Sequence, residues 1–248
     1  MNSLSLTCSI ASVIALLLPV ALTSAQKQAQ YTGNLTIVSK FAPADFVPEG
    51  DLSKSVWRGA EFARFDEEAL ARKKHPQAET RVASAWTPSY VYFAFQCRYT
   101  VLNVYEGEQT GKEKWGLWNR DVVEAFINPS PERFNHYYEF EVSPNNQWID
   151  LEIDLDKEPF NDAGWDSRFE HATRVDEANH VWNCEMKIPV SALGTVPIKP
   201  GAEWRINFYR ADGKGDDSQR LFLSWSPLPG SKMTFHQPAS FSIIRFVR

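Results

Sequence analysis

Apolar and polar residues alternate along most of this chain, and an alternation with a period of two predicts β-strands. The segments with this pattern are rich in β-branched and aromatic residues, which strands favour. They span residues 80–86, 90–100, 121–127, 136–142, 148–155, 181–189, 203–211, 219–226 and 239–247. Turn-forming residues, such as those at 87–89 and 143–147, separate neighbouring segments.

Helical signals are scarce in the same stretch of sequence. Residues 66–75 have the composition of a helical turn or two, and residues 189–194 predict a short helix that Gly194 closes. Many short strands divided by turns favour an all-β fold, an antiparallel β-sandwich of jelly-roll or immunoglobulin-like type with few short helices. Neither a repeat nor a linker divides the chain, so we expect one domain over residues 36–248.

The N-terminal segment has a different pattern. Residues 9–25 form an apolar run that ends in small residues, which is typical of a secretory signal peptide cleaved after Ala25. Residues 26–35 would then form a flexible lead. Because the segment before the run lacks Lys and Arg, a transmembrane anchor is the alternative. The signal-peptide interpretation predicts a secreted or periplasmic protein with no membrane span after cleavage.

Export to an oxidising compartment would leave two cysteines, Cys97 and Cys184. Both lie in predicted strands, so they can form a disulfide if those strands are neighbours. Two buried free thiols are an equal alternative. Two cysteines make neither a disulfide scaffold nor a zinc site.

The composition narrows the classes of partner. The net charge is −5 and the basic residues are dispersed, so nothing suggests a nucleic-acid surface. Nine Trp, eight Tyr and sixteen Phe indicate a large aromatic core, an aromatic binding face, or both. The tryptophans expected in the core, because they lie in or beside apolar segments, are Trp57, Trp86, Trp182, Trp204 and Trp225.

Trp115 and Trp118 follow the polar segment 106–114 instead, so at least one of them should be exposed. An exposed indole in a secreted β-sandwich can pack against the apolar face of a sugar ring. In the alternative interpretation, Trp118 folds back and closes an edge of the sandwich.

Glu124 interrupts the apolar strand 121–127. Val123 should face one side of the sheet, and Phe126 should share the other side with Glu124. A carboxylate there must reach the surface or be paired, because an unpaired buried charge is costly. Sugar hydroxyls, Arg120 or a bound cation are candidate partners.

Acidic residues also alternate along strand 148–155, where we expect them on a solvated face. They are Asp150, Glu152, Asp154 and Asp156. Such acids can supply ligands to a calcium ion, although no loop has the spacing of calcium ligands. The sequence has no HxH, HExxH or GxSxG motif, so metal-hydrolase and serine-hydrolase chemistry lack support.

Four segments, in this order, resemble the family 9 carbohydrate-binding modules. They are EGDLSKSVWRGAEF (49–62), TRVASAWTPSYVYFAFQC (80–97), WNRDVVEAFIN (118–128) and LSWSP with FHQPASFSIIRF (223–246). The resemblance covers nearly the whole chain beyond the signal peptide. It implies a β-sandwich related to the DOMON superfamily and a glycan-binding function, in which two aromatic rings hold the end of a sugar chain.

The resemblance also implies roles for individual residues. Trp118 matches the first ring of the clamp, and Glu124 matches the carboxylate that bonds sugar hydroxyls. Phe235 falls where the second ring belongs, although that position is Trp in the family member compared. Glu141 and Ser143 fall where the family has an Arg and an Asn that contact sugar. Family members bind calcium, so the resemblance implies a structural calcium ion without assigning its ligands.

We therefore expect a secreted, non-catalytic protein that binds a polysaccharide or oligosaccharide of the xylan or cellulose type. It would serve polysaccharide breakdown beside a separate glycoside hydrolase. One alternative is a small glycoside hydrolase that uses Glu124 with Glu141 or Asp121. Another is a haem-binding protein of the DOMON type, with Met233 and His236 as axial ligands.

Overall fold

The computed structural model describes residues 31–107, 111–162, 164–194 and 196–248, and Tyr31–Arg248 form one compact unit. The predicted signal peptide and the start of the lead lie outside the described residues. The strands are β1 (Thr36–Phe41), β2 (Ala63–Phe65), β3 (Thr80–Trp86), β4 (Tyr90–Arg98), β5 (Val122–Asn128), β6 (His136–Val142), β7 (Trp148–Asp154), β8 (Asn161–Asp162), β9 (Glu170–Asp176), β10 (Val181–Pro189), β11 (Glu203–Asp212), β12 (Leu221–Ser224) and β13 (Ser242–Val247). The helical elements are α2 (Ser55–Arg58) and the 3-10 turns η1 (Pro76–Ala78), η2 (Leu117–Asn119), η3 (Val190–Leu193) and η4 (Pro238–Ser240).

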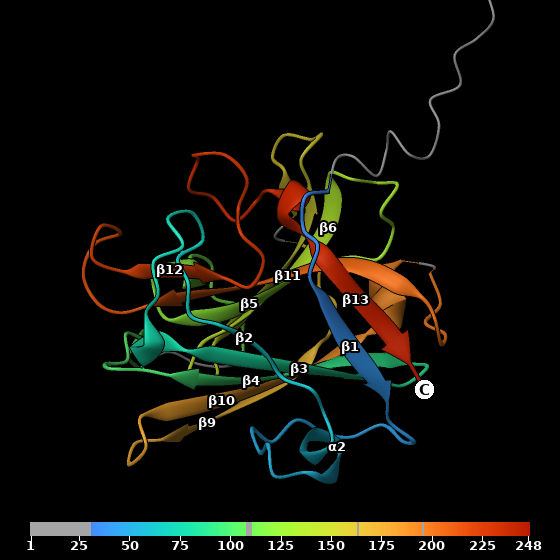
Figure 1. Ribbon diagram of the computed structural model, residues 1–248, viewed down its shortest axis with the longest axis horizontal. Coiled ribbons are helices and arrows are strands. Elements are labelled where there is room, and N and C mark those ends of the chain that lie inside the picture. Colours follow the sequence, from blue (N-terminus) through green and yellow to red (C-terminus); the bar gives the residue numbers. More distant parts are fainter. Residues whose placement is uncertain (1–30, 108–110, 163, 195) are drawn as a thin grey trace, which may run out of the picture. The chain divides into compact units, whose positions relative to one another are not determined.

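The strands form one curled sheet in the order β8-β7-β6-β5-β11-β13-β1-β3-β4-β10-β9, with β12 beside β11 and β2 beside β3. Figure 1 shows β5, β11 and β12 in one layer, β3, β4, β10 and β9 in the other, and β13 and β1 crossing between them. Pairing is antiparallel except where β1 lies parallel to both β13 and β3. The predicted all-β sandwich with few short helices is confirmed.

Three apolar clusters hold the sheet together. The largest fills the space between the two layers and includes Phe93, Phe140 and Phe208. The second covers the other face of β5, β6, β7 and β11, and a third packs Trp57 against the outer face of β3 and β4. Val123 lies in the first cluster and Val122 and Phe126 lie in the second, which is the division of faces expected from the alternation in β5.

The sequence located most strands, and β3, β6 and β10 have the predicted bounds. Strands β1, β2, β8 and β9 were not predicted. The helix expected at residues 66–75 was wrong, because this segment forms a turn between the β-bridges Glu67↔Lys74 and Glu68↔Leu223. The short helix expected at 189–194 is the 3-10 turn η3, and Gly194 follows it with φ +90°.

The five tryptophans expected in the core are buried, and Trp115 is 55% exposed, as predicted. Cys97 and Cys184 are buried free thiols on the neighbouring strands β4 and β10, so the disulfide alternative does not hold. Burial raises the pKa of Cys97 to about 12.

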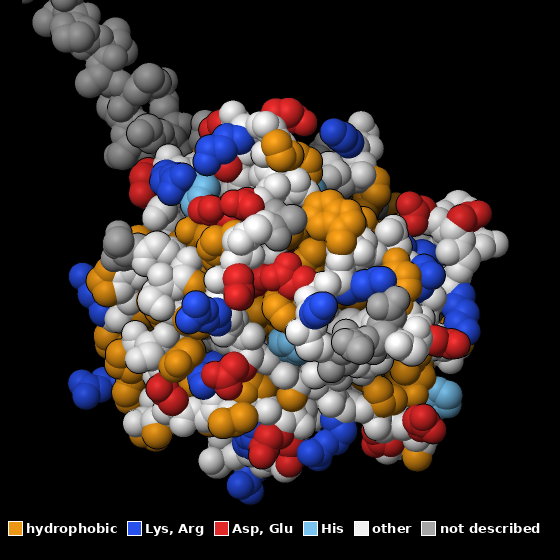
Figure 2. Space-filling model, turned by 180° about the vertical axis from the view of Figure 1, so that it is seen from behind, with side chains coloured by type: hydrophobic (Ala, Val, Ile, Leu, Met, Phe, Trp, Pro, Cys, Tyr) orange, Lys and Arg blue, Asp and Glu red, His pale blue; other side chains and the backbone are white. Residues whose placement is uncertain are grey.

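The surface has no large patch of one charge on the face drawn in Figure 2, where basic and acidic side chains are interspersed with apolar ones. No helix among the described residues is long and apolar enough to cross a membrane.

Candidate functional site

A cavity of about 600 Å³ opens on the face of β5, β6 and β7 that carries the second apolar cluster. It collects side chains from the loop before β5, from the sheet itself and from the loop between β12 and η4. Its lining includes the predicted residues Trp118, Glu124, Glu141 and Phe235. Aromatic and aliphatic side chains therefore form its walls, and carboxylates form part of its floor.

The Trp118 wall is held by a constrained turn. Gly116 adopts φ +79°, which suits a residue without a Cβ, and the 3-10 turn η2 begins directly after it. Leu117 is fully buried and anchors the turn, while Tyr105 donates a hydrogen bond to the Gly116 carbonyl at 3.2 Å. Arg220 fixes the other side by donating to the Trp118 carbonyl at 3.0 Å. Trp118 is thus half-buried in a fixed turn, in line with both a stacking role and an edge-closing role.

The Phe235 wall lies on the loop that follows β12. Its ring stacks on Tyr209 of β11, with centroids 4.2 Å apart and planes inclined by 14°. The Tyr209 hydroxyl also donates to the Phe235 carbonyl at 3.2 Å. Tyr209 lies opposite Glu124 in the β11–β5 pairing, so the ring is held close to the carboxylate floor.

The floor consists of Glu124 on β5 and Glu139 and Glu141 on β6. One carboxylate oxygen of each lies within 4.8 Å of the others. Glu124 and Glu141 are directly opposite each other in the antiparallel pair, where like charges destabilise a sheet. All three side chains are at most 3% exposed.

Donors for Glu139 and Glu141 are scarce among the described residues, and these two carboxyl groups are within hydrogen-bonding reach of each other, which helps to raise the pKa of Glu141. Both carboxylate oxygens of Glu141 and Oε2 of Glu139 are buried without a hydrogen bond. Burial, and then the charge of Glu139, raise the pKa of Glu124 well above its usual range, although Arg220 opposes the shift. Burial and the neighbouring Glu124 and Glu139 likewise raise the pKa of Glu141.

Two basic groups line the cavity, and each interacts with other groups of the protein. Arg220 donates to the carbonyls of Trp118 and Arg120 and lies 3.4 Å from an oxygen of Asp217. His236 Nδ1 lies 2.8 Å from the Tyr137 hydroxyl, and its Nε2 is 4.0 Å from Glu139 Oε2.

The other predicted residues lie elsewhere. Ser143 is fully buried at the end of β6 and is not among the residues that line the cavity. Asp121 is also outside the lining, where it accepts hydrogen bonds from the backbone N–H groups of Asn103 and Gly213 at 2.9 Å. Burial, and then the charge of Asp212, raise the pKa of Asp121 to about 7.

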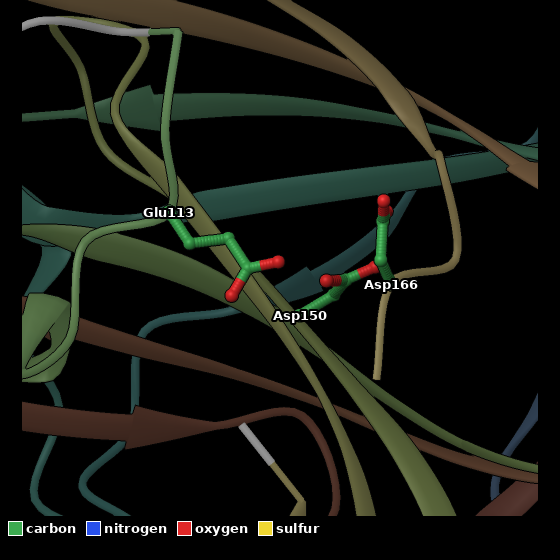
Figure 3. Close-up of side chains that lie close together, drawn as sticks. All are labelled: Glu113, Asp150 and Asp166. Carbon is green, nitrogen blue, oxygen red and sulfur yellow. The ribbon is translucent and has the colours of Figure 1, made fainter. Parts of the chain in front are cut away.

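The prediction that Asp150 lies on a solvated acidic face was wrong. Asp150 is fully buried, because the segment at Ser167 covers it and both the backbone N–H and the hydroxyl of Ser167 donate to its Oδ2. Its Oδ1 is buried and is bonded by no basic or neutral donor among the described residues, while Glu113, whose pKa is raised to about 7 by burial and by Asp150, lies within hydrogen-bonding reach of the Asp150 carboxyl group. Figure 3 shows the carboxyl groups of Glu113, Asp150 and Asp166 close together, and one oxygen of each lies within 4.8 Å of the others.

This second acidic cluster fits a calcium ion by the chemistry of its donors. Calcium prefers carboxylate oxygens, and Asp150 Oδ1 is a buried acceptor that a cation would satisfy. The three side chains come from the loop before η2, from β7 and from the loop before β9, so an ion would join segments that are far apart in sequence.

Comparison of the sequence with models of known protein families identifies the family of this chain. A family model described as Carbohydrate family 9 binding domain-like matches residues 49–247. The chain belongs to this family. The resemblance drawn from the four sequence segments is therefore confirmed.

Solved structures share the fold of this family 9 domain. A Bacteroides uniformis protein, named as a candidate carbohydrate-binding protein, aligns with a TM-score of 0.68 and 22% identity, over 87% of this chain and all of that chain. A family 9 carbohydrate-binding module from Caldicellulosiruptor kristjanssonii in complex with cellotriose aligns with a TM-score of 0.61 and 18% identity, over 86% of this chain and 94% of that one. The glucose complex of a family 9 module from the same organism gives the same score, over 97% of that chain. At these identities, the likeness concerns the fold.

A curated relative adds one further comparison. A protein from Arthroderma benhamiae named Extracellular protein is 30% identical over 146 residues, which cover 53% of this family 9 chain and 63% of the relative. The chain therefore spans less than two thirds of that relative's length in the match.

Two residues of the site escaped sequence reasoning as functional candidates: Arg220 and Tyr209. Glu139 shares a face of β6 with Glu141, because side chains two residues apart on a strand point to the same side. Nothing local in the sequence marks Arg220 or Tyr209, whose contacts with residues 118 and 235 depend on the tertiary fold.

Proposed function

We propose that this family 9 domain is a secreted, non-catalytic protein that binds a glycan in the cavity between Trp118 and Phe235. One observation carries the proposal: Trp118 of η2 and Glu124 of β5 line the same cavity as Phe235, which lies on a loop far from them in the sequence. Sugar rings have apolar C–H faces that pack against aromatic rings and hydroxyl rims that bond carboxylates. The walls and floor of the cavity supply both kinds of partner.

Each element of the cavity has a definite task in this proposal. Trp118 and Phe235 contact the faces of the ring and exclude water from it. Glu124, at the floor, accepts hydrogen bonds from hydroxyls and so sets the orientation of the ring. The glycan would be of the plant or microbial polysaccharide type, such as xylan or cellulose, and a separate glycoside hydrolase would cleave it. The extracellular name of the Arthroderma benhamiae relative supports secretion.

The hydrolase alternative has weaker support. A glycosidase places two carboxyl groups on either side of the scissile bond. Glu124 and Glu141 are instead neighbours on one sheet face, and Asp121 is engaged by two backbone N–H groups away from the lining.

The positions of Met233 and His236 give little support to the haem alternative. Met233 and His236 lie three residues apart, whereas axial ligands reach the iron from opposite faces. His236 Nδ1 is also engaged by the Tyr137 hydroxyl.

Isothermal titration with cello- and xylo-oligosaccharides tests the proposal. Trp118→Ala should lower the affinity at least about tenfold, since a tenfold change requires only about 1.4 kcal/mol of lost stacking. Trp115→Ala is the control within the same loop: Trp115 is exposed and outside the lining, and its ring packs edge-on against Trp118 with centroids 5.1 Å apart, so its removal should weaken binding less than the removal of Trp118. Failure of the wild type to bind any glycan, or an equal loss in both variants, would contradict the proposal.

A structural calcium ion is the second part of the proposal. Glu113, Asp150 and Asp166 would hold it, and the ion would supply positive charge to the buried Asp150 Oδ1. By tying the loop before η2 to β7, these ligands would steady the turn that presents Trp118.

A further inference from the structure

The floor of the cavity has more acidic groups than a neutral sugar requires. Glu124, Glu139 and Glu141 meet there. The basic groups of the lining are Arg220 and His236, and both have other partners. The floor therefore has three acidic groups, and the basic group that faces them among the described residues is His236, whose Nε2 lies 4.0 Å from Glu139 Oε2.

We propose that the cavity selects a positively charged sugar, an amino sugar of the glucosamine class, whose ammonium group lies on the floor formed by Glu124, Glu139 and Glu141. This inference rests on the proposed glycan-binding function and names its substrate class.

The hydrogen-bonding capacity of the floor matches an ammonium group. An ammonium has three N–H donors and no acceptor, whereas ionised carboxylates are acceptors only. Three carboxylate oxygens, one from each glutamate, lie within 4.8 Å of one another, so a single nitrogen can reach all of them. Such charge-assisted hydrogen bonds would fill the vacant acceptors on Glu139 and Glu141.

The walls suit the same ligand. Aromatic rings attract cations through their faces as well as packing against sugar C–H groups. The cavity has five such rings, on Trp118, Phe126, Phe160, Phe222 and Phe235. An aromatic enclosure above an acidic floor therefore favours a ring with a positive charge over an equally large neutral ring.

A metal ion is a poorer fit to this floor. Calcium takes six to eight oxygen ligands. Beyond its three carboxylates, much of the lining around this floor is aromatic or aliphatic, including Phe126 and Leu151, and supplies no further oxygen ligands. The floor also disfavours uronic acids, because a further carboxylate would join an acidic cluster in which neighbouring carboxylates already raise the pKa of Glu124 and Glu141.

Titration calorimetry with β-1,4-linked tetrasaccharides of equal length tests this inference. The ligands are the glucosamine tetramer, its fully N-acetylated form, cellotetraose and a β-1,4-linked glucuronic acid tetramer. We expect the glucosamine tetramer to bind at least about tenfold more tightly than cellotetraose. N-acetylation should remove that advantage because it removes the positive charge, and the uronic acid should bind most weakly.

Variants locate the charged contact. Glu141→Gln and Glu139→Gln should each lower the ratio of glucosamine to cellotetraose affinity by several fold. Glu61→Gln removes the same charge from a side chain that is 75% exposed outside the cavity, and it should leave the ratio unchanged. Circular dichroism and thermal melts establish that each variant folds.

The outcomes distinguish a failure of the amino-sugar inference from a failure of the proposed glycan-binding function. If cellotetraose binds as tightly as the glucosamine tetramer, the inference is wrong and the glycan-binding function stands. A glucosamine preference that survives both cavity substitutions also overturns it. If calcium binding is lost in Glu141→Gln while no glucosamine preference exists, the floor is a metal site instead. Binding of no glycan at all contradicts the proposed function itself.

Discussion

Two regions of this protein bury a carboxylate equally deeply and treat it in opposite ways. Glu185 on β10 and Glu141 on β6 are each 1% exposed. Glu185 accepts hydrogen bonds from Trp57 Nε1 at 2.6 Å, from Lys54 Nζ at 2.9 Å and from the backbone N–H of Glu49 at 2.7 Å. Neither carboxylate oxygen of Glu141 has a hydrogen-bond partner among the described residues.

The difference separates a structural carboxylate from a candidate ligand-binding one. Glu185 joins α2 and the segment before it to the sheet, and every bond it accepts comes from the protein. Glu141 lies at a cavity, and its two carboxylate oxygens accept no hydrogen bond from a donor of the protein. Burying such acceptors costs free energy in the unbound protein, and a ligand that donates hydrogen bonds to them would offset this cost. Asp150 is intermediate, since Ser167 satisfies one of its oxygens while no basic or neutral donor among the described residues bonds the other.

The largest expected change in stability comes from removing Glu185, the buried carboxylate whose hydrogen bonds are all made within the protein. Glu185→Ala should lower the free energy of unfolding by about 3–5 kcal/mol, because it leaves the Lys54 charge and the Trp57 N–H without their buried acceptor. Urea denaturation followed by tryptophan fluorescence measures the change. Glu203→Gln, at an exposed ion pair with Arg245, should change stability by no more than about 0.5 kcal/mol. Equal stability of the wild type and Glu185→Ala would show that Glu185 does not stabilise the fold, and would contradict its role as a structural carboxylate.

The half-satisfied Asp150 gives the next prediction. Calcium at one hundred times its Kd should raise the free energy of unfolding by about 2.7 kcal/mol if it binds only the folded state. Asp150→Asn should abolish most of this gain while its amide oxygen still accepts from Ser167. Asp154→Asn, on the same strand, is the control and should keep the gain. Thermal melts in calcium and in chelator measure both, and an equal response of the two variants would contradict a site at Asp150.

The same contrast explains how far the sequence predicts the fold. Alternation located strands such as β3 and β10 because their apolar faces are buried in the core. It missed β9, an edge strand with no buried position, because pairing with β10 rather than its own pattern makes it a strand. Residues 66–75 have helix-forming composition, but the bridges to Lys74 and Leu223 override it.

The site was predictable where a strand pattern or a family resemblance marked it. The alternation in β5 identified the face of Glu124, and the resemblance led to Trp118 and Phe235, which share one cavity. The burial of Asp150 was not predictable, because strand 148–155 alternates like a half-exposed strand and only the distant Ser167 segment covers it. Which carboxylates lack partners likewise depends on contacts that no local pattern encodes.

The third prediction concerns pH in the absence of calcium. The pKa of Asp121 is about 7, and burial raises the pKa of Glu124 and Glu141 well above their usual range. Between about pH 4 and these raised values, the folded state binds more protons than the unfolded state, so stability falls as the pH rises. His171 opposes this trend below pH 6.5, because burial lowers its pKa to about 4 and its stability contribution is lost on acidification.

The carboxylates outnumber this histidine, so the wild type should be more stable at pH 5 than at pH 8, by about 2 kcal/mol. Urea denaturation at the two pH values in chelator measures the difference. Higher stability at pH 8 would mean that the floor carboxylates are paired in solution, in conflict with their unpartnered geometry.

The smallest effect is the sharpest test of the comparison, because it applies one substitution to both regions. At pH 8, Glu141→Gln should raise the free energy of unfolding by about 1 kcal/mol, since it removes a buried charge opposite Glu124 that no donor compensates. Glu185→Gln should lower it, because the ion pair with Lys54 is lost. The gain from Glu141→Gln should shrink from pH 8 towards pH 5, because burial and the neighbouring Glu124 and Glu139 raise the pKa of Glu141 and so favour its neutral form. Destabilisation by Glu141→Gln at both pH values would mean that Glu141 has a partner in the folded protein, and the distinction between the two carboxylates would then disappear.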